Sequence, residues 1–290
     1  MARKSLVDGA EAYKARKFDQ AEQFFRDAIA RDPEGNTLEG KTAQLFLART
    51  LHSQYIGNRQ ETAKAEEAIQ EYKKVLDEDI TDNSSFKAIA NLLENLGRKD
   101  EQIKWITDRT NNDLVPEDQR AEALTSLASK QITCANDISD VEPVKKTVEK
   151  DGVASFVFSK PQDEKTFDEF KQCVQKGTEL VDKALQFEPE TIKNPGNKEV
   201  TSLTDQELAK LLDLDKKFQS AWSYKANALI QQMRQAEMEG NNEAKEDFKK
   251  KAEEARDKFT ALNELEKKIV SEQENRKKVE EEKEAEAANK

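Results

Sequence analysis

Few residues in this chain of 290 residues could do chemistry. His52 is the only histidine, and the two cysteines, Cys134 and Cys173, do not form a Cys-x-x-Cys pair. A zinc site needs three or four ligands, and a catalytic triad needs a base beside its nucleophile. Neither set of residues is present, so His52 is interpreted as an ordinary residue of the surface or of a binding groove.

The remaining polar residues follow the pattern of solvated helices. The chain has no Gly-rich phosphate loop, and its 59 Asp and Glu residues mostly lie four positions from a Lys or Arg. Such i,i+4 spacing forms ion pairs on exposed helix faces. We therefore expect no enzymatic activity, no metal site and no cofactor.

The composition favours helix and excludes several kinds of partner. Charged residues make up 37% and hydrophobic residues 36%, with only 9 Gly and 6 Pro. This balance is typical of helical proteins. The net charge of −11 argues against nucleic acid and against anionic membrane surfaces. No apolar run approaches the roughly 20 residues that span a bilayer, and the N-terminal segment lacks the apolar centre of a signal peptide.

The clearest pattern runs from Gly9 to Pro33, with the sequence GAEAYKARKFDQAEQFFRDAIARDP. Small residues alternate with large ones at fixed offsets: Gly9, Ala21 and Ala28 with Tyr13, Phe18 and Phe25. The small residues allow two helices to approach, the large ones fill the space between them, and Pro33 ends the second helix. The segment resembles a tetratricopeptide repeat (TPR), a helical hairpin that stacks on copies of itself.

Less regular copies follow, so the resemblance implies an all-α fold, a right-handed α-solenoid of about five helical hairpins. The predicted repeats span residues 2–35, 41–80, 83–115, 117–190 and 219–265, and residues 266–290 form a charged C-terminal helix or a disordered tail. An insertion at 136–165 contains two β-prone segments around Asp151-Gly152, which predicts a small β-hairpin. Asn83 is the expected N-cap of the third repeat, and a short helix is expected from Thr204 to Leu212.

The split fourth repeat also places the cysteines. Cys134 falls near the end of its first helix and Cys173 near the start of its second, and these two ends are neighbours in a helical hairpin. We expect a disulfide between them; the alternative is two unrelated thiols in a reducing compartment. A disulfide would indicate the periplasm or the exterior, with a leader removed, and its absence would indicate the cytoplasm. The insertions and the segment WSYK also resemble a bacterial TPR subgroup that is often exported to the cell envelope.

The TPR resemblance implies a partner-binding groove formed by the first helix of each repeat. Eight residues are assigned to it: Tyr13, Arg49, His52, Lys87, Asn91, Glu94, Ser129 and Asn227. Lys87 and Asn91 match half of the clamp with which some TPR domains bind the carboxylates of acidic peptides. The positions of the other half are not basic: they are Leu6, Ala10, Glu122 and Ser126. We therefore expect an extended or helical peptide in a mixed polar and aromatic groove, without a carboxylate clamp.

The predicted function is a non-catalytic scaffold for protein–protein interaction. The alternative is an oligomeric structural or assembly protein that associates with itself through the hairpin insertion or the C-terminal helix. Binding of a small molecule in the groove and an enzyme carried by the insertion are two further alternatives. We expect a protein or peptide partner, no nucleic acid, no membrane insertion and a monomeric chain.

Overall fold

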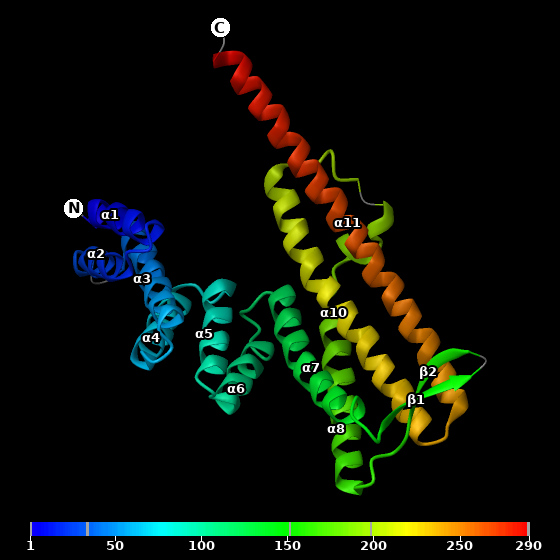
Figure 1. The fold of residues 1–290 in the computed structure, drawn as a ribbon. Coiled ribbons are helices and arrows are strands. Elements are labelled where there is room, and N and C mark those ends of the chain that lie inside the picture. Colours follow the sequence, from blue (N-terminus) through cyan, green and yellow to red (C-terminus); the bar gives the residue numbers. More distant parts are fainter. Residues whose placement is uncertain (1, 33–34, 151, 198, 289–290) are drawn as a thin grey trace. The chain divides into compact units, whose positions relative to one another are not determined.

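The computed structural model describes residues 2–32, 35–150, 152–197 and 199–288, which are almost entirely helical (Figure 1). The predicted all-α class is confirmed. Contacts divide the chain into two compact parts, Met1–Pro116 and Glu117–Lys290, called unit 1 and unit 2 below. None of the helices in the described ranges is long and apolar enough to cross a membrane.

Unit 1 consists of three helical hairpins. They are α1 (Ala2–Lys14) with α2 (Phe18–Ala30), α3 (Leu38–Gly57) with α4 (Thr62–Glu78), and α5 (Asn83–Asn95) with α6 (Lys99–Thr110). The first hairpin packs as its sequence pattern predicts, because Phe25 is fully buried against Gly9. A Cβ atom on Gly9 would lie 2.6 Å from Cε1 of Phe25, so only glycine allows α1 and α2 this close. Pro33, which is predicted to end this hairpin, lies outside the described residues.

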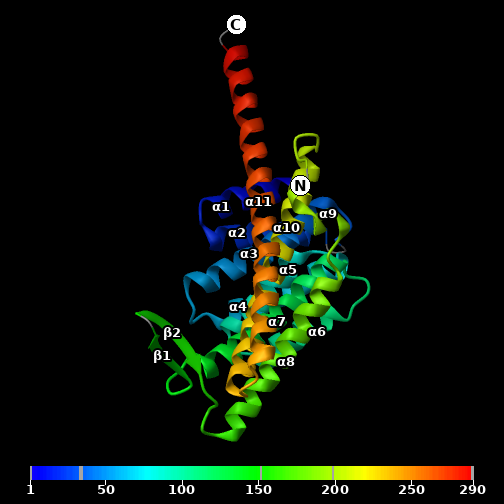
Figure 2. The same ribbon diagram turned by 90° about the vertical axis from the view of Figure 1, so that its right-hand side faces the viewer.

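Unit 2 consists of two longer hairpins that lie side by side (Figure 2). The helix α7 (Glu117–Ser139) packs against α8 (Glu164–Gln186), and α10 (Asp205–Met238) packs against α11 (Asn242–Ala288). The short helix α9 (Glu190–Lys193) and a 3-10 turn at Pro195–Asn197 connect them. Phe218 of α10 and Leu262, Leu265 and Ile269 of α11 are buried between the long helices. This apolar stripe holds α10 and α11 together.

The predicted β-hairpin is confirmed. The strands β1 (Lys145–Lys150) and β2 (Val153–Phe158) pair antiparallel from Lys145↔Phe158 to Lys150↔Val153, which leaves a two-residue turn. Gly152 has the positive φ, 77°, that such turns require, and Asp151 lies outside the described residues. Phe158 anchors the hairpin because its ring is buried in a cluster of unit 2 residues: Phe167, Phe170, Val174 and Met238.

Two predicted helix boundaries are wrong. The N-cap of α5 is Asp82, whose carboxylate accepts a hydrogen bond from the backbone N–H of Ser85 at 2.8 Å, so Asn83 is already helical. The predicted short helix 204–212 is the beginning of α10, which runs on to Met238 without interruption. Thr204 and Glu207 form a capping box at its start, and neither Gly nor Pro follows in the helix to end it.

Candidate functional site

A pocket of about 440 Å³ opens in unit 1 between α1, α3 and α4. It is lined by three of the predicted groove residues, Tyr13, Arg49 and His52. Arg16 reaches it from the turn after α1, Phe18 from the start of α2, and Tyr72 from α4. We call this cavity the unit 1 pocket. Its volume suits a few side chains of a partner protein.

Aromatic rings form one wall of the unit 1 pocket. The ring of Tyr13 meets Phe18 edge-on, with the ring centroids 5.6 Å apart, and meets Phe46 in the same way at 5.8 Å. The hydroxyl of Tyr13 lies 3.4 Å from Oγ of Ser53. Edge-to-face packing stabilises such rings in place, so this wall is formed before a partner binds.

His52 and Tyr72 form a neutral pair in the same pocket. Nδ1 of His52 lies 3.4 Å from the hydroxyl of Tyr72, and the two rings are nearly perpendicular, at 89°. Burial, with a smaller contribution from the charge of Arg59, lowers the pKa of His52. Burial also raises the pKa of the Tyr72 hydroxyl. Both side chains are therefore uncharged at neutral pH, so the charge of the pocket comes from its arginines.

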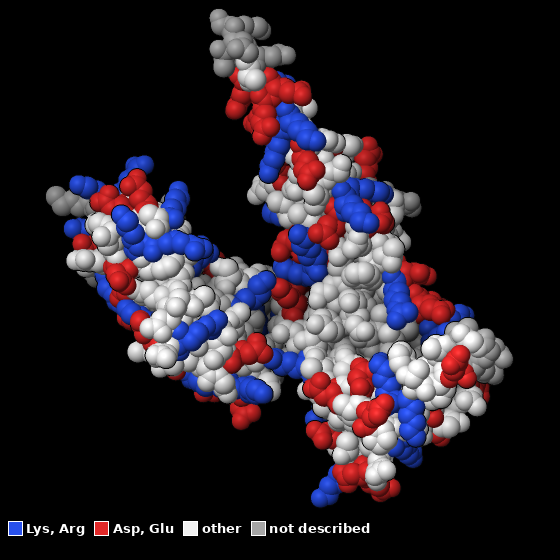
Figure 3. Space-filling view, viewed as in Figure 1, with Lys and Arg blue, Asp and Glu red and all other residues white. Residues whose placement is uncertain are grey.

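Arg16 and Arg49 give the unit 1 pocket its positive charge. Among the described residues that line it, none is Asp or Glu, and neither arginine has an ion-pair partner in the described part of the chain. Arg49 instead stacks on Phe46, with Cζ 5.5 Å from the ring centroid, and its Nη2 donates to Oγ of Ser84 at 3.4 Å. Figure 3 shows a group of Lys and Arg side chains on the face formed by α1 to α3. The lining of the unit 1 pocket is therefore positively charged in a chain whose net charge is −11.

Arg16 occupies a strained backbone position. Its φ is 57°, in the left-handed region, and it lies two residues beyond Lys14, the last residue of α1. The backbone N–H of Arg16 donates to Tyr13 O and that of Lys17 donates to Ala12 O, both at 2.9 Å, which closes the helix end. Glycine is the residue that usually occupies such a position. The chain therefore holds an arginine at the pocket where the backbone favours glycine.

The other predicted groove residues lie outside this pocket. Lys87, Asn91 and Glu94 lie along one exposed face of α5, at the i, i+4, i+7 spacing that brings them into line. The hydrogen bond of Arg49 to Ser84 connects the pocket side of α3 to the first turn of α5. The structure thus brings Tyr13, Arg49 and His52 together and leaves the α5 residues on an adjoining helix.

Two predicted residues belong to unit 2. Ser129 is half-buried on α7, where its hydroxyl donates to the backbone oxygen of Ser126 at 2.8 Å, and Asn227 is exposed on α10. Neither lines the unit 1 pocket. Their assignment to a binding groove stays a prediction.

Six residues that line the pocket were not predicted as groove residues, among them Arg16, Phe18 and Tyr72. Phe18 is predicted from the sequence to fill the space between two helices, and Tyr72 is assigned to no site, although both reach the cavity. Arg16 was not considered. The sequence does mark Arg16, because this residue stands in a turn between two helices, where glycine is usual.

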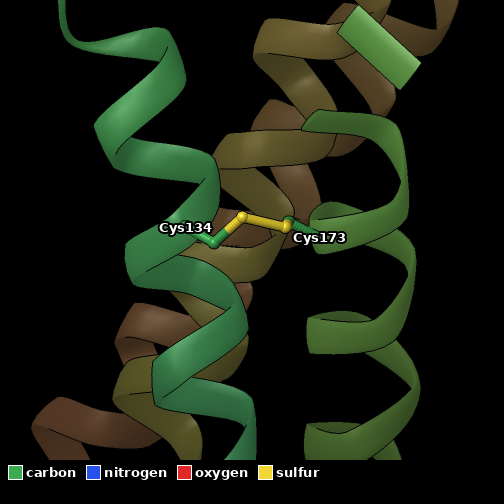
Figure 4. Close-up of a disulfide and its surroundings, with 2 residues drawn as sticks. All are labelled: Cys134 and Cys173. Atoms are coloured by element: carbon green, nitrogen blue, oxygen red, sulfur yellow. A yellow bond between two sulfur atoms is a disulfide. The ribbon is translucent and has the colours of Figure 1, made fainter. Parts of the chain in front are cut away.

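The structure contains the predicted disulfide. Cys134 of α7 and Cys173 of α8 are bonded, with an S–S distance of 2.03 Å and a Cα–Cα distance of 6.1 Å. Figure 4 shows the bridge joining the two helices. Buried apolar residues surround it, among them Ala135, Phe170 and Val174. The bridge closes the helical hairpin from which the β-hairpin emerges. In the described ranges, no three His, Cys, Asp or Glu side chains are grouped so as to hold a metal ion.

The chain matches no protein family by sequence and no curated protein. Among solved structures it is similar to a tetratricopeptide repeat protein from Parabacteroides merdae, with 13% identity, a TM-score of 0.37 and coverage of 93% of this chain and 98% of that one. It is also similar to a proposed protein-binding protein from Bacteroides ovatus, with 13% identity, a TM-score of 0.27 and coverage of 93% and 99%.

Proposed function

We propose that this chain is a non-catalytic scaffold that binds a protein partner through the unit 1 pocket. The observation that carries the proposal is the composition of that pocket: Arg16 and Arg49 lie beside an aromatic wall, and no Asp or Glu is among the described lining residues. An unpaired guanidinium next to apolar surface is suited to a partner that presents a carboxylate beside an apolar side chain. A charge-assisted hydrogen bond of this kind contributes about 1.5–3 kcal/mol.

The proposed partner segment extends from the pocket onto α5. Lys87, Asn91 and Glu94 present polar groups along one exposed helix face, and α5 is connected to the pocket side of α3 through Arg49 and Ser84. A segment that fills the pocket with one or two side chains can continue along this face. This supports an extended or helical peptide as the ligand, in preference to a small molecule that the pocket alone would hold.

The proposal is tested by capturing partners from the native host with the full chain as bait. Arg49→Glu reverses one charge of the pocket, and Arg3→Glu makes the same change at an exposed position of α1 outside it. We expect proteins that the unchanged chain and Arg3→Glu recover and that Arg49→Glu loses. With a purified partner, Arg49→Glu should raise the Kd by about 30-fold, which corresponds to about 2 kcal/mol. Equal recovery by both variants would remove the pocket from consideration.

A further inference from the structure

The β-hairpin has two edges, one formed by β1 and one by β2, and each edge carries backbone groups that point away from the hairpin. The N–H of Ser159 donates to Val144 O at 2.8 Å, so these two residues form a hydrogen-bonded pair. Such pairs alternate along an antiparallel ladder with pairs that exchange no hydrogen bond. By the observed register, Thr147 and Phe156 form a pair of the second kind. The backbone N–H and C=O of both residues therefore point away from the hairpin, Thr147 at the edge of β1 and Phe156 at the edge of β2.

The edge of β1 is protected. The N–H of Lys145, at its first position, already donates to Val141 O at 3.0 Å. The strand also carries the charged residues Lys145, Lys146 and Glu149. Charged side chains and occupied backbone donors are the usual means by which proteins prevent an edge strand from pairing with another chain.

The edge of β2 has no such protection. Its sequence, VASFVF, contains neither a charged residue nor a proline. The outward N–H groups of Ala154, Phe156 and Phe158 have no acceptor among the described residues. Phe156 is 58% exposed, although its neighbour Phe158 is buried. The tip of the hairpin projects from the helices of its own unit (Figure 2), while β2 contacts α10 at its Phe158 end.

We propose that β2 pairs with β2 of a second copy of the chain, antiparallel, to form a four-stranded sheet. A two-fold axis through Phe156 places Phe156 opposite its own copy, Ala154 opposite Phe158 and Ser155 opposite Val157. Each outward-facing residue then exchanges both backbone hydrogen bonds with its partner. Small residues oppose large ones on either side of a central Phe156–Phe156 pair, and no pair brings like charges together, so the strand is complementary to itself.

This pairing forms a weak dimer. A strand of six residues is about 20 Å long, and an interface of that size falls below the roughly 1,000 Å² that stable complexes bury. Association should therefore depend on concentration. The inference rests on the hairpin alone and is independent of the function proposed for the unit 1 pocket.

Sedimentation velocity of the full chain from about 1 to 500 µM tests the proposal. Phe156→Pro removes an outward N–H from β2, and Thr147→Pro removes one from β1; neither N–H takes part in the hairpin's own ladder. We expect the average mass of the unchanged chain and of Thr147→Pro to rise with concentration. The Kd for self-association of Phe156→Pro should be at least about tenfold higher. A chain that stays monomeric over the whole range, as it would if a strand of another protein were the natural occupant, overturns the proposal.

A second pair of variants serves if proline disrupts the hairpin itself. Residues of a hydrogen-bonded antiparallel pair lie about 5.5 Å apart at Cα, which is within the range of a disulfide. Oxidation of Phe156→Cys should join two copies covalently, while Thr147→Cys should not be cross-linked. Equal cross-linking of the two variants, or none of Phe156→Cys, contradicts the pairing of β2 with β2.

Discussion

Arg16 combines backbone strain with the proposed binding function, and replacing it with glycine separates the two. At a φ of 57° a residue with a side chain is destabilised by about 1–2 kcal/mol, and glycine is not. Glycine in turn makes the unfolded chain more flexible, which offsets about 0.4–1 kcal/mol of that gain. Arg16→Gly should therefore raise the free energy of unfolding by about 0.5–1 kcal/mol. The same change removes one of the two guanidinium groups of the pocket.

Calorimetry and a binding titration measure the two effects on the same sample. The unfolding midpoint of Arg16→Gly should rise by about 1–4 °C. Its Kd for a captured partner should rise at least about tenfold, because one charge-assisted hydrogen bond worth about 1.5–3 kcal/mol is lost. Arg16→Ala is the matched control: it loses the guanidinium and keeps the strained backbone, so it should bind as weakly as Arg16→Gly without the gain in stability.

Either measurement can refute the argument about Arg16. If Arg16→Gly and Arg16→Ala unfold at the same temperature, the left-handed backbone does not carry the assumed strain. If both variants bind the partner as the unchanged chain does, Arg16 lies outside the binding site, whatever its conformation.

Three further predictions concern unit 1 and unit 2 separately. Burial raises the pKa of Asp215 to about 6 from 3.8, so the folded state favours the protonated acid and stability falls as the pH rises from about 4 to 6. Asp215→Asn should therefore increase the free energy of unfolding by at most about 3 kcal/mol at pH 8 and change it little below pH 4, as measured by urea unfolding. Reducing the bridge between Cys134 and Cys173, 39 residues apart, should lower the free energy of unfolding by about 3–4 kcal/mol, measured with and without reductant. Gly9→Ala forces a Cβ to within 2.6 Å of the Phe25 ring and should destabilise the chain by about 1–3 kcal/mol, measured by thermal unfolding.

Each of these predictions has a matched control. Asp257→Asn, at an exposed position of α11, should not change the pH dependence, and a similar response from it would contradict the assignment to Asp215. A chain with serine in place of both cysteines should show no effect of reductant. Gly57→Ala adds a Cβ that meets nothing within 4 Å, so it should be neutral or slightly stabilising; a loss equal to that of Gly9→Ala would refute the packing argument.

The sequence predicted those parts of the fold that depend on neighbouring residues. Gly9 and Phe25 sit at repeat positions, and the Asp-Gly turn specifies a hairpin locally, so both features follow from short patterns. The prediction of a short helix was wrong because a new repeat was expected to begin at residue 219. Residues 212–220 contain no Gly or Pro, so α10 continues through them. The pocket was predicted in part, because Tyr13, Arg49 and His52 were assigned to one groove and all three line it. The hydroxyl of Tyr72 lies near His52 because α4 packs on α3, and this tertiary contact does not follow from a short sequence pattern.

The positions that the repeat pattern specifies are those that bury side chains between helices, and buried side chains cannot meet a partner. The pattern therefore accounts for stacking and is silent about the ligand. Features specific to this chain must lie where it departs from the pattern. Arg16 stands where the backbone favours glycine, and β2 exposes an uncharged edge in a segment that the repeat does not need. Arg16 has no ion-pair partner, and the outward N–H groups of β2 have no acceptor, among the described residues of their own units. Each departure is therefore expected to be retained for what it binds.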